Sequence, residues 1–337
     1  MTPMQSEGKQ EESKAVEHPV VSIVVTVYNH ERYIERCLRG IAMQKCSFTY
    51  EVLIGEDCSP DGSREVLKRL QAELPDCFHF FYREHNMGDG GDGNSGDLLR
   101  RCTGKYLAIC EGDDFWTYDG KLQEQVDFLE GHPDYVACFH HCTVVGENSE
   151  PNSEKYPDCL KEDYSFKEFF YCTMPGQTAT FMARREPYED AKRLFNEHRL
   201  FRSYATDRRN AFILLTVGKV RVFQRAWSAY RHVSAGGTSY SSRVAIDEDY
   251  ARNEVQFGKT LVAYAEVLGS DEAVRAAKQT YFRLLLKWSV GAVKVSQLGD
   301  ALRELMRQPG WLGYLLGVPR WYAVLVARLL AGRGVTL

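Results

Sequence analysis

The sequence predicts an α/β protein with a doubly wound, mostly parallel sheet flanked by helices, followed by a C-terminal helical extension. Apolar runs rich in β-branched residues, such as residues 20–27 (VVSIVVTV), are typical of strands buried on both faces of a parallel sheet. In the first half of the chain such runs alternate with amphipathic helical patterns across short connections, as in βαβ units. From Glu248 onward the pattern is helical and free of cysteine.

Hydrophobic periodicity locates the elements of the first half. The expected strands cover residues 20–27, 50–55, 78–82 and 105–110. Two helices are expected between the first three strands, with Asn29 and Ser63 as their N-caps. Their inward residues, at helical spacing, are Ile34, Cys37, Leu38 and Ile41 in one helix and Val66, Leu67, Leu70 and Leu74 in the other.

The middle of the chain has weaker patterns. An amphipathic helix is expected over residues 119–130, and strands are expected at 135–140 and 177–183. Residues 86–96 are rich in glycine but lack the Gly-Lys-Ser/Thr ending of a Walker A loop. This segment is either a flexible turn or a loop that borders a ligand. Residues 147–161 are expected to form a loop.

Composition and charge divide the chain and exclude some functions. The 42 basic and 46 acidic residues give a net charge of −4, so the chain is not a general nucleic-acid binder. Residues 1–18 form a polar leader that we expect to be disordered, residues 19–245 the α/β domain and residues 246–337 the helical extension. The ten cysteines form no CxxC pair and are expected to be reduced.

The sequence also suggests where the protein acts. It has no apolar signal core near its N-terminus and no uncharged apolar run of about 18 residues, which favours a cytoplasmic protein without an ordinary transmembrane helix. Residues 309–331 are aromatic and basic. Such a segment either packs on the core or contacts the inner face of the cell membrane peripherally, and the sequence leaves both readings open.

An acidic cluster follows the fourth strand directly. Glu111-Gly112-Asp113-Asp114 places three carboxyl groups in four residues. Because ligands bind at the carboxyl ends of parallel strands, these acids are expected at the binding edge of the sheet. Such a cluster needs a cation or wide exposure to solvent, and carboxylate oxygens suit Mg²⁺ or Mn²⁺. The alternative is an acidic helix N-terminus stabilised by the helix dipole.

Two further loops are expected at the same edge of the sheet. Residues 56–63 follow the second strand and contain Asp57, whose carboxylate can accept hydrogen bonds from a base or a ribose. Residues 26–31 follow the first strand. Taken alone, residues 26–31 are equally consistent with an ordinary strand-to-helix turn, and residues 56–63 with an Asx-turn that leads into the helix cap at Ser63. Their convergence with the acidic cluster favours a ligand site.

These three motifs, in this order and at this spacing, resemble family 2 glycosyltransferases of the GT-A fold. The resembling segments are VSIVVTVYNHERYI from Val21, GEDCSPDGS from Gly55 and EGDDFW from Glu111, and the resemblance covers about residues 19–245. It implies transfer of a single sugar from a nucleotide-diphosphate donor, usually with inversion, to a glycan or lipid-linked glycan, with Mn²⁺ or Mg²⁺ as cofactor. Uridine diphosphate is the expected nucleotide.

The resemblance also implies roles for individual residues. Thr26, Tyr28 and Glu31 correspond to positions that line the nucleotide base and ribose, and Asp57 to the acid that hydrogen-bonds the base. Glu111 and Asp113 correspond to the two acids of the DxD motif, and Glu111 is a departure from the commoner aspartate. Asp113 is the expected metal ligand, with Asp114 beside it, and Glu111 and Asp114 are expected to border the donor.

The acceptor side requires a base. The acceptor hydroxyl must lose a proton, and a carboxylate at the start of a helix would serve. Thr206-Asp207-Arg208-Arg209 resembles that place in the family, so Asp207 is the candidate base; its alternative role is to stabilise the helix dipole. In Tyr230-Arg231-His232, which resembles a family segment, Arg231 or His232 could meet the diphosphate.

Two other functions fit parts of this pattern. A sugar-nucleotide pyrophosphorylase shares a related fold but would have a glycine-rich, basic phosphate loop after the first strand. A non-catalytic protein that binds nucleotide sugars is a further alternative, which the combination of Asp57, Asp113 and Asp207 disfavours. The zinc-type residues Cys138-Phe-His-His-Cys142 are interpreted as structural, because neighbours along a strand point to opposite faces.

Overall fold

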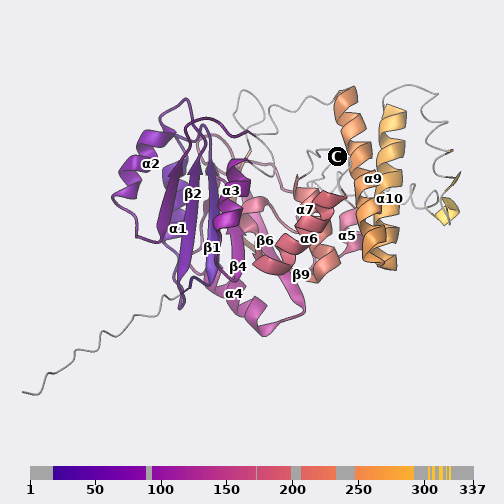
Figure 1. Cartoon of the computed structure of the whole chain (residues 1–337), viewed down its shortest axis with the longest axis horizontal. Helices are drawn as coiled ribbons and strands as arrows, with labels where there is room; N and C mark the ends of the chain where they lie inside the picture. The colour runs from indigo at the N-terminus through magenta and orange to yellow at the C-terminus, as the bar shows by residue number, and fades with distance from the viewer. Residues whose placement is uncertain are drawn as a thin grey trace, which may run out of the picture.

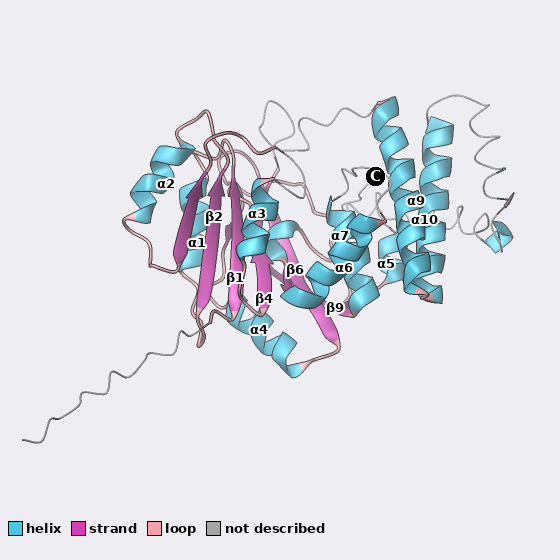
Figure 2. Cartoon of the chain, viewed as in Figure 1, coloured by secondary structure: helices cyan, strands magenta, loops and turns pink. Residues whose placement is uncertain are grey.

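A computed structural model describes residues 18–88, 93–171, 173–198, 206–232 and 247–291, with isolated residues between 303 and 319. It contains a nine-stranded sheet with helices on both faces, and a pair of long helices at one end (Figures 1 and 2). The predicted α/β class is therefore confirmed.

The sheet is parallel on one side and mixed on the other. Its strands are β1 (Val21–Val27), β2 (Tyr50–Glu56), β3 (Phe78–Tyr82), β4 (Tyr106–Ile109), β5 (Phe115–Trp116), β6 (Tyr135–Val145), β7 (Asp163–Tyr164), β8 (Met182–Arg184) and β9 (Lys219–Arg231). The order is β3-β2-β1-β4-β8-β6-β9-β5, with β7 also paired to β9. Strands β1 to β4 are mutually parallel, and β8 is antiparallel to both β4 and β6. The order reverses at β1, which makes the carboxyl edge there the usual ligand position in an open α/β sheet.

Helices cover both faces of the sheet. They are α1 (Ile34–Ala42), α2 (Ser63–Gln71), α3 (Asn94–Arg101), α4 (Lys121–Gly131), α5 (Phe166–Phe170), α6 (Arg185–Glu197), α7 (Thr206–Val217), α9 (Glu248–Leu268) and α10 (Asp271–Gly291), with a 3₁₀ turn η1 (Thr178–Thr180). Two cores result: α1, α2 and α4 pack on one face, and α3, α6 and α7 on the other. Alternate β1 residues enter opposite cores, as Ile23 and Val24 show. This explains the nearly continuous apolar run of β1.

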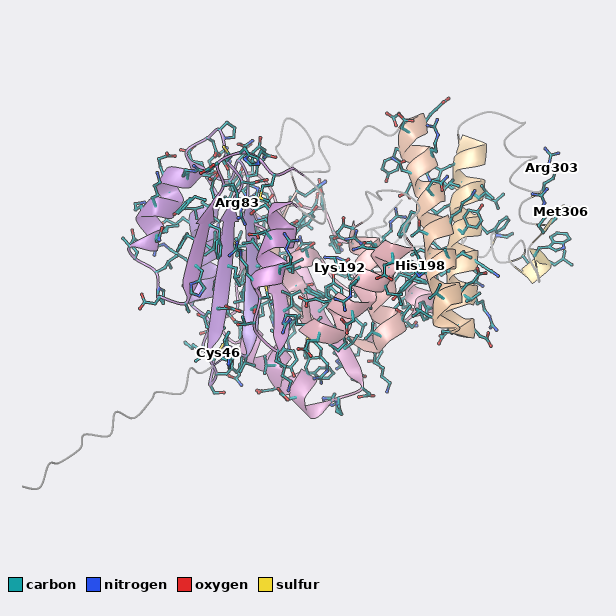
Figure 3. All side chains as sticks on the ribbon, viewed as in Figure 1. Cys46, Arg83, Lys192, His198, Arg303 and Met306 are labelled. Atoms are coloured by element: carbon teal, nitrogen blue, oxygen red, sulfur yellow. The ribbon has the colours of Figure 1, made fainter. Side chains whose placement is uncertain are left out.

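Hydrogen bonds join β2, β3 and α3 at the carboxyl edge of the sheet. Figure 3 labels Arg83, which directly follows β3 at the carboxyl edge, and Cys46, which lies at the opposite edge. Arg83 hydrogen-bonds Asn94 Oδ1 at 3.0 Å and Asp97 Oδ2 at 2.7 Å, and so joins β3 to α3. Asn94 Nδ2 in turn donates to the carbonyl of Gly55 at 2.7 Å, at the end of β2.

Several expectations for local structure need correction. Residues 177–183 do not form one strand, because the Gln177 side chain accepts a hydrogen bond from Ala179 N and closes the η1 turn before β8. Asn29 does not cap α1, which starts at Ile34 without a side-chain cap; Asn29 instead adopts a left-handed φ of 61°. Ser63 is the first residue of α2, and its hydroxyl accepts a hydrogen bond from His30 N at 2.8 Å.

The two long helices α9 and α10 lie side by side and pack on the α/β part (Figure 1). Phe257 and Tyr264 of α9 belong to the same buried cluster as Phe195 of α6 and Phe212 of α7. No helix among the described residues is both long and apolar enough to span a membrane. Most of the aromatic segment 309–331 lies outside the described residues, as do residues 1–17.

Candidate functional site

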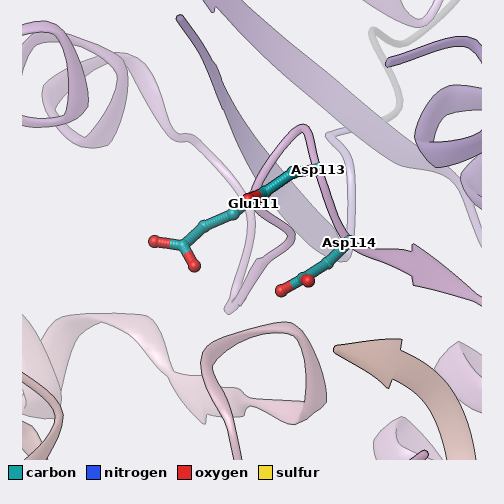
Figure 4. A group of neighbouring side chains, drawn as sticks. All are labelled: Glu111, Asp113 and Asp114. Atoms are coloured by element: carbon teal, nitrogen blue, oxygen red, sulfur yellow. The ribbon is translucent and has the colours of Figure 1, made fainter. Parts of the chain in front are cut away.

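The acidic cluster forms a tight turn between β4 and β5 (Figure 4). Gly112 N donates to the carbonyl of Thr26 at 3.0 Å, which ties the turn to the end of β1, and Asp114 N donates to the carbonyl of Glu111 at 2.9 Å. A β-carbon on Gly112 would lie 2.6 Å from His30 Nδ1 and 2.9 Å from Thr26 O, so this close approach requires glycine.

The three carboxyl groups are close enough to share a cation. One oxygen from each of Glu111, Asp113 and Asp114 lies within 4.8 Å of the others. His30 Nε2, from the turn after β1, is 4.0 Å from Asp113 Oδ1. Among the described residues this is the one group of three or more potential ligands with such spacing.

Crowding of negative charge shifts the protonation of the cluster. Desolvation, together with the charges of Asp113 and Asp207, raises the pKa of Glu111 to about 8. Desolvation also raises the pKa of Asp114 well above its ordinary value, reinforced by Asp113 and Glu111 and opposed by the Arg231 N–H. All the candidate ligand atoms are carboxylate oxygens, which suit a hard divalent cation, and such a cation would relieve the mutual repulsion. The residues present therefore fit Mg²⁺ or Mn²⁺.

Asp114 differs from its neighbours because protein groups hold both of its oxygens. Gln177 Nε2 donates to Oδ2 at 2.7 Å, and Arg231 N donates to Oδ1 at 2.8 Å. The residue is buried, with 1% of its surface exposed. Asp114 thus anchors the turn, whereas Glu111 and Asp113 are the more accessible candidates for direct contact with a cation.

Arg231 is a structural partner of the same turn. Its Nε donates to the Asp113 carbonyl at 2.9 Å, and its terminal nitrogens donate to the carbonyl of Gly146 at 2.6 Å and to Ser149 Oγ at 2.9 Å. The guanidinium also stacks 3.9 Å from the ring centroid of Tyr33. These contacts commit Arg231 to holding the turn, and His232 pairs with Glu154.

The loops after β1 and β2 meet beside this turn. Asp57 is 8% exposed, its N–H donates to the Val27 carbonyl at 2.9 Å, and its Oδ1 accepts from Met87 N at 2.8 Å. Its other oxygen makes no hydrogen bond within the described part of the chain. Glu31 Oε2 accepts from Gly62 N at 3.0 Å, which closes the loops on each other.

The backbone at this edge is unusual in two places. Asn29 and Cys58, one in each loop, have φ values of 61° and 56°, in the left-handed region that non-glycine residues seldom adopt. Ser59 Oγ accepts from Asn29 N at 3.1 Å and so connects the two bends. Tyr28 and Thr26 are half-buried beside them. Backbone bends of this kind are concentrated at binding and active sites.

The candidate base lies at the start of α7. Asp207 is exposed, and Thr178 Oγ1 donates to its Oδ1 at 3.3 Å. Surrounding protein atoms raise the pKa of Asp207 above its ordinary value, while the Thr178 hydroxyl and then Arg209 and Arg208 act to lower it. Arg208 points to the long helices, where it pairs with the buried Glu254 of α9.

Sequence reasoning did not identify Gln177, Thr178 and Glu254 as neighbours of the site. Each is a common polar residue whose importance comes from a partner far away in the sequence, so the chain itself carries no local signal for them. The Cys138–Cys142 segment with its zinc-type residues lies on β6, and His140 Nδ1 is hydrogen-bonded to the His141 carbonyl. The segment forms no metal-ligand group within the described residues.

Comparisons with known proteins identify the family of the chain. The family model described as glycosyl transferase family 2 matches residues 22–192, about half of the chain. An uncharacterised protein of Mycobacterium tuberculosis, Rv1520, is 37% identical over 171 residues, which cover 50% of this chain and 49% of that protein. The putative teichuronic acid biosynthesis glycosyltransferase TuaG of Bacillus subtilis is 33% identical over 111 residues, 33% of this chain and 42% of TuaG. The chain thus spans about half the length, or less, of these relatives.

Solved structures share the fold. Residues 1–349 of S. aureus TarS, crystallised with UDP-GlcNAc, superimpose with a TM-score of 0.59 at 18% identity, covering 84% of this chain and 79% of that one. At this identity the similarity concerns the fold alone.

Proposed function

Because the chain belongs to glycosyl transferase family 2, we propose that it transfers a single sugar, with inversion, from a nucleotide-diphosphate sugar to a glycan or lipid-linked glycan. One observation carries the proposal. Three acidic features converge on the carboxyl edge of the sheet: Asp57, the Glu111–Asp114 turn and the Thr178–Asp207 pair. The sheet position, the acidic cluster and a separate carboxylate together suit departure of a diphosphate and activation of a hydroxyl.

The donor in this proposal is a uridine diphosphate sugar. The partly unbonded, buried carboxylate of Asp57 is suited to accept a hydrogen bond from an N–H of the base. The TarS structures that share the fold were crystallised with UDP-GlcNAc and with UDP, which supports the choice of uridine. The name of TuaG supports a cell-surface glycan as acceptor.

Asp113 and Glu111 are the residues that would hold Mn²⁺ or Mg²⁺, and Asp114 would keep their turn in place. A bound divalent cation supplies positive charge that offsets the charge developing on the departing diphosphate. The raised pKa of Glu111 means that this side chain must release a proton before it can act as a ligand.

Asp207 is the proposed base. It takes the proton of the acceptor hydroxyl as that oxygen forms a bond to the anomeric carbon. The bond from the anomeric carbon to the diphosphate oxygen breaks, and its electron pair leaves with the diphosphate. The raised pKa of Asp207 makes it a stronger base than an ordinary aspartate, and the Thr178 hydroxyl fixes its direction.

A nucleotide panel tests this proposal. Thermal unfolding is measured with UDP, GDP, CDP, ADP and dTDP, each with Mn²⁺ and with EDTA. A nucleotide at about 100 times its dissociation constant stabilises the native state by about 2.7 kcal/mol. We expect UDP to stabilise the protein only with Mn²⁺, and Asp113→Asn to abolish the effect. Asp134→Asn, a surface acid paired with Lys219, is the matched control and should keep it.

Turnover distinguishes an enzyme from a binding protein. UDP release from UDP-GlcNAc should occur in the wild type and be lost in Asp207→Asn, which should still bind Mn²⁺ and UDP. Equal turnover in Asp207→Asn would remove this residue as the base. Stabilisation by nucleotide without any turnover of any nucleotide sugar, with or without glycan acceptors, would favour a non-catalytic nucleotide-sugar binding protein.

A further inference from the structure

The η1 turn is a rigid connection built from buried hydrogen bonds. The Gln177 carbonyl accepts from Thr180 N at 2.9 Å and from Thr180 Oγ1 at 2.7 Å. Trp116 Nε1 donates to the Ala179 carbonyl at 2.8 Å, and Gln125 Nε2 to the Thr180 carbonyl at 3.0 Å. The backbone of the turn is therefore held by its own hydrogen bonds and by side chains of β5 and α4, in addition to the contacts that its side chains make with the acidic residues.

Consecutive side chains of this turn reach the two acidic centres. Gln177, which is 2% exposed, donates to Asp114 Oδ2 at 2.7 Å. Thr178 donates to Asp207 Oδ1 at 3.3 Å. Asp114 belongs to the acidic turn after β4, whereas Asp207 starts α7. One short turn thus sets the position of both acids.

The orientation of the Gln177 amide follows from its partners. Its Oε1 accepts from Ala179 N at 2.6 Å, while its Nε2 faces Asp114. A flipped amide would place two donors together at Ala179 N, which is repulsive, and would take away the N–H group that donates to Asp114 Oδ2. The side chain is therefore locked as a donor to Asp114.

From these contacts we propose that Gln177 and Thr178 are positioning residues for sugar transfer, Gln177 for the acidic turn and Thr178 for the base. The inference rests on the proposed function and adds two residues to it. Gln177 acts through Asp114 on the Glu111 and Asp113 carboxyl groups, and Thr178 acts through Asp207. Removing a residue that hydrogen-bonds to metal ligands without itself touching the metal typically lowers metal affinity or activity by about 10- to 100-fold.

Paired variants separate the two roles. Gln177→Leu should weaken binding of UDP with Mn²⁺ about tenfold in isothermal titration calorimetry. Thr178→Val should leave that binding unchanged but lower the rate of UDP release from UDP-GlcNAc about tenfold or more, because the base loses its orientation. Thr178→Ser keeps the hydroxyl and should restore the rate. Thr173→Val, which removes a buried hydroxyl bonded to the Glu168 carbonyl elsewhere, is the control for a purely structural loss.

The pH profile gives a second measure of Thr178. Its hydroxyl lowers the pKa of Asp207, so Thr178→Val should move the acid limb of the rate profile to higher pH, and Thr178→Ser should not. Other charged or titratable groups that interact electrostatically with Asp207 are unchanged in both variants: Arg208, Arg209, Glu111, Tyr156, Tyr188 and Tyr230.

Two results would overturn the inference: wild-type binding of UDP and Mn²⁺ in Gln177→Leu, or a wild-type rate and pH profile in Thr178→Val. If Gln177→Leu fails to fold, Thr178→Val and Thr178→Ser still test the proposed role of Thr178. If the wild type itself neither binds nor turns over nucleotide, the proposed function fails separately. The ¹³C carboxyl titration of Asp207, assigned with Asp207→Asn, then tests Thr178 directly: an unchanged pKa in Thr178→Val refutes the coupling.

Discussion

Raising the pH from 6 to 8 should strengthen Mn²⁺ binding about 50-fold, because Glu111 must lose a proton before it can act as a ligand. Desolvation and the neighbouring acids Asp113 and Asp207 raise its pKa to about 8. At pH 6 only about one molecule in 100 has Glu111 ionised, and at pH 8 about half do. The ratio of these fractions gives the expected gain in affinity, which levels off above pH 8.

Calorimetric titration of Mn²⁺ in the presence of UDP measures this dependence. Repeating it at pH 7 in buffers of different ionisation enthalpy should show release of about 0.9 proton for each ion bound. Glu111→Gln should bind more weakly and lose the proton release. Glu130→Gln, which removes a surface acid paired with Lys105, should behave as the wild type. An affinity independent of pH between 6 and 8, with no proton release, would show that Glu111 does not bind the cation as a carboxylate.

Three further outcomes are expected from buried groups around the site. Burial lowers the pKa of Lys121 to about 7, so between pH 7 and 10 the unfolded chain binds more protons than the folded protein. The free energy of unfolding of the wild type, measured in urea relative to Lys121→Met, should therefore rise by roughly 3 kcal/mol over that pH range. Gly112→Ala should lower the free energy of unfolding by about 1–3 kcal/mol and weaken Mn²⁺ binding, because the added β-carbon would meet the Thr26 carbonyl. Wild-type stability together with wild-type Mn²⁺ affinity would contradict the close approach. Glu254→Gln should cost about 3 kcal/mol, because it removes the buried carboxylate that pairs with Arg208. Arg208→Gln in addition should recover part of the loss, and equal stability of all three proteins would show that the pair is not coupled.

The parallel half of the fold was predictable because its strands are buried on both faces. Each of β1 and β2 feeds two cores, so nearly every residue must be apolar and the run is visible in the sequence. The strand β9 was not predicted. It contains Lys219, Arg221 and Arg225, and these charged residues interrupt its apolar residues because much of its length is covered on one side only.

Short elements fixed by distant partners were also missed. Helix α3 starts at Asn94 inside the glycine-rich segment, and its place depends on the bonds from Asn94 to Gly55 and Arg83. The strand expected over residues 177–183 is interrupted because Gln177 bonds its own backbone and Asp114. Neither partner can be inferred from a local window of sequence.

The candidate site was predictable as a location but not as a set of contacts. Parallel strands bring their carboxyl ends to one edge, so the order of the motifs was sufficient to place Asp57 beside the acidic cluster. Spacing within Glu111–Asp114 could not show that Asp114 turns inward to Gln177 and Arg231. Nor could it show that Arg231, a candidate for diphosphate contact, is committed to the Asp113 carbonyl and to Ser149.

Calorimetric titration of UDP into the wild type and Asp113→Asn, with Mn²⁺ and then with EDTA, tests the central claim most directly. We expect binding by the wild type that disappears in EDTA, and a loss of metal-dependent binding in Asp113→Asn while its unfolding transition stays cooperative. Equal UDP affinity in EDTA, or undiminished Mn²⁺-dependent binding by Asp113→Asn, would contradict the assignment of the Glu111–Asp114 turn as the metal and diphosphate site.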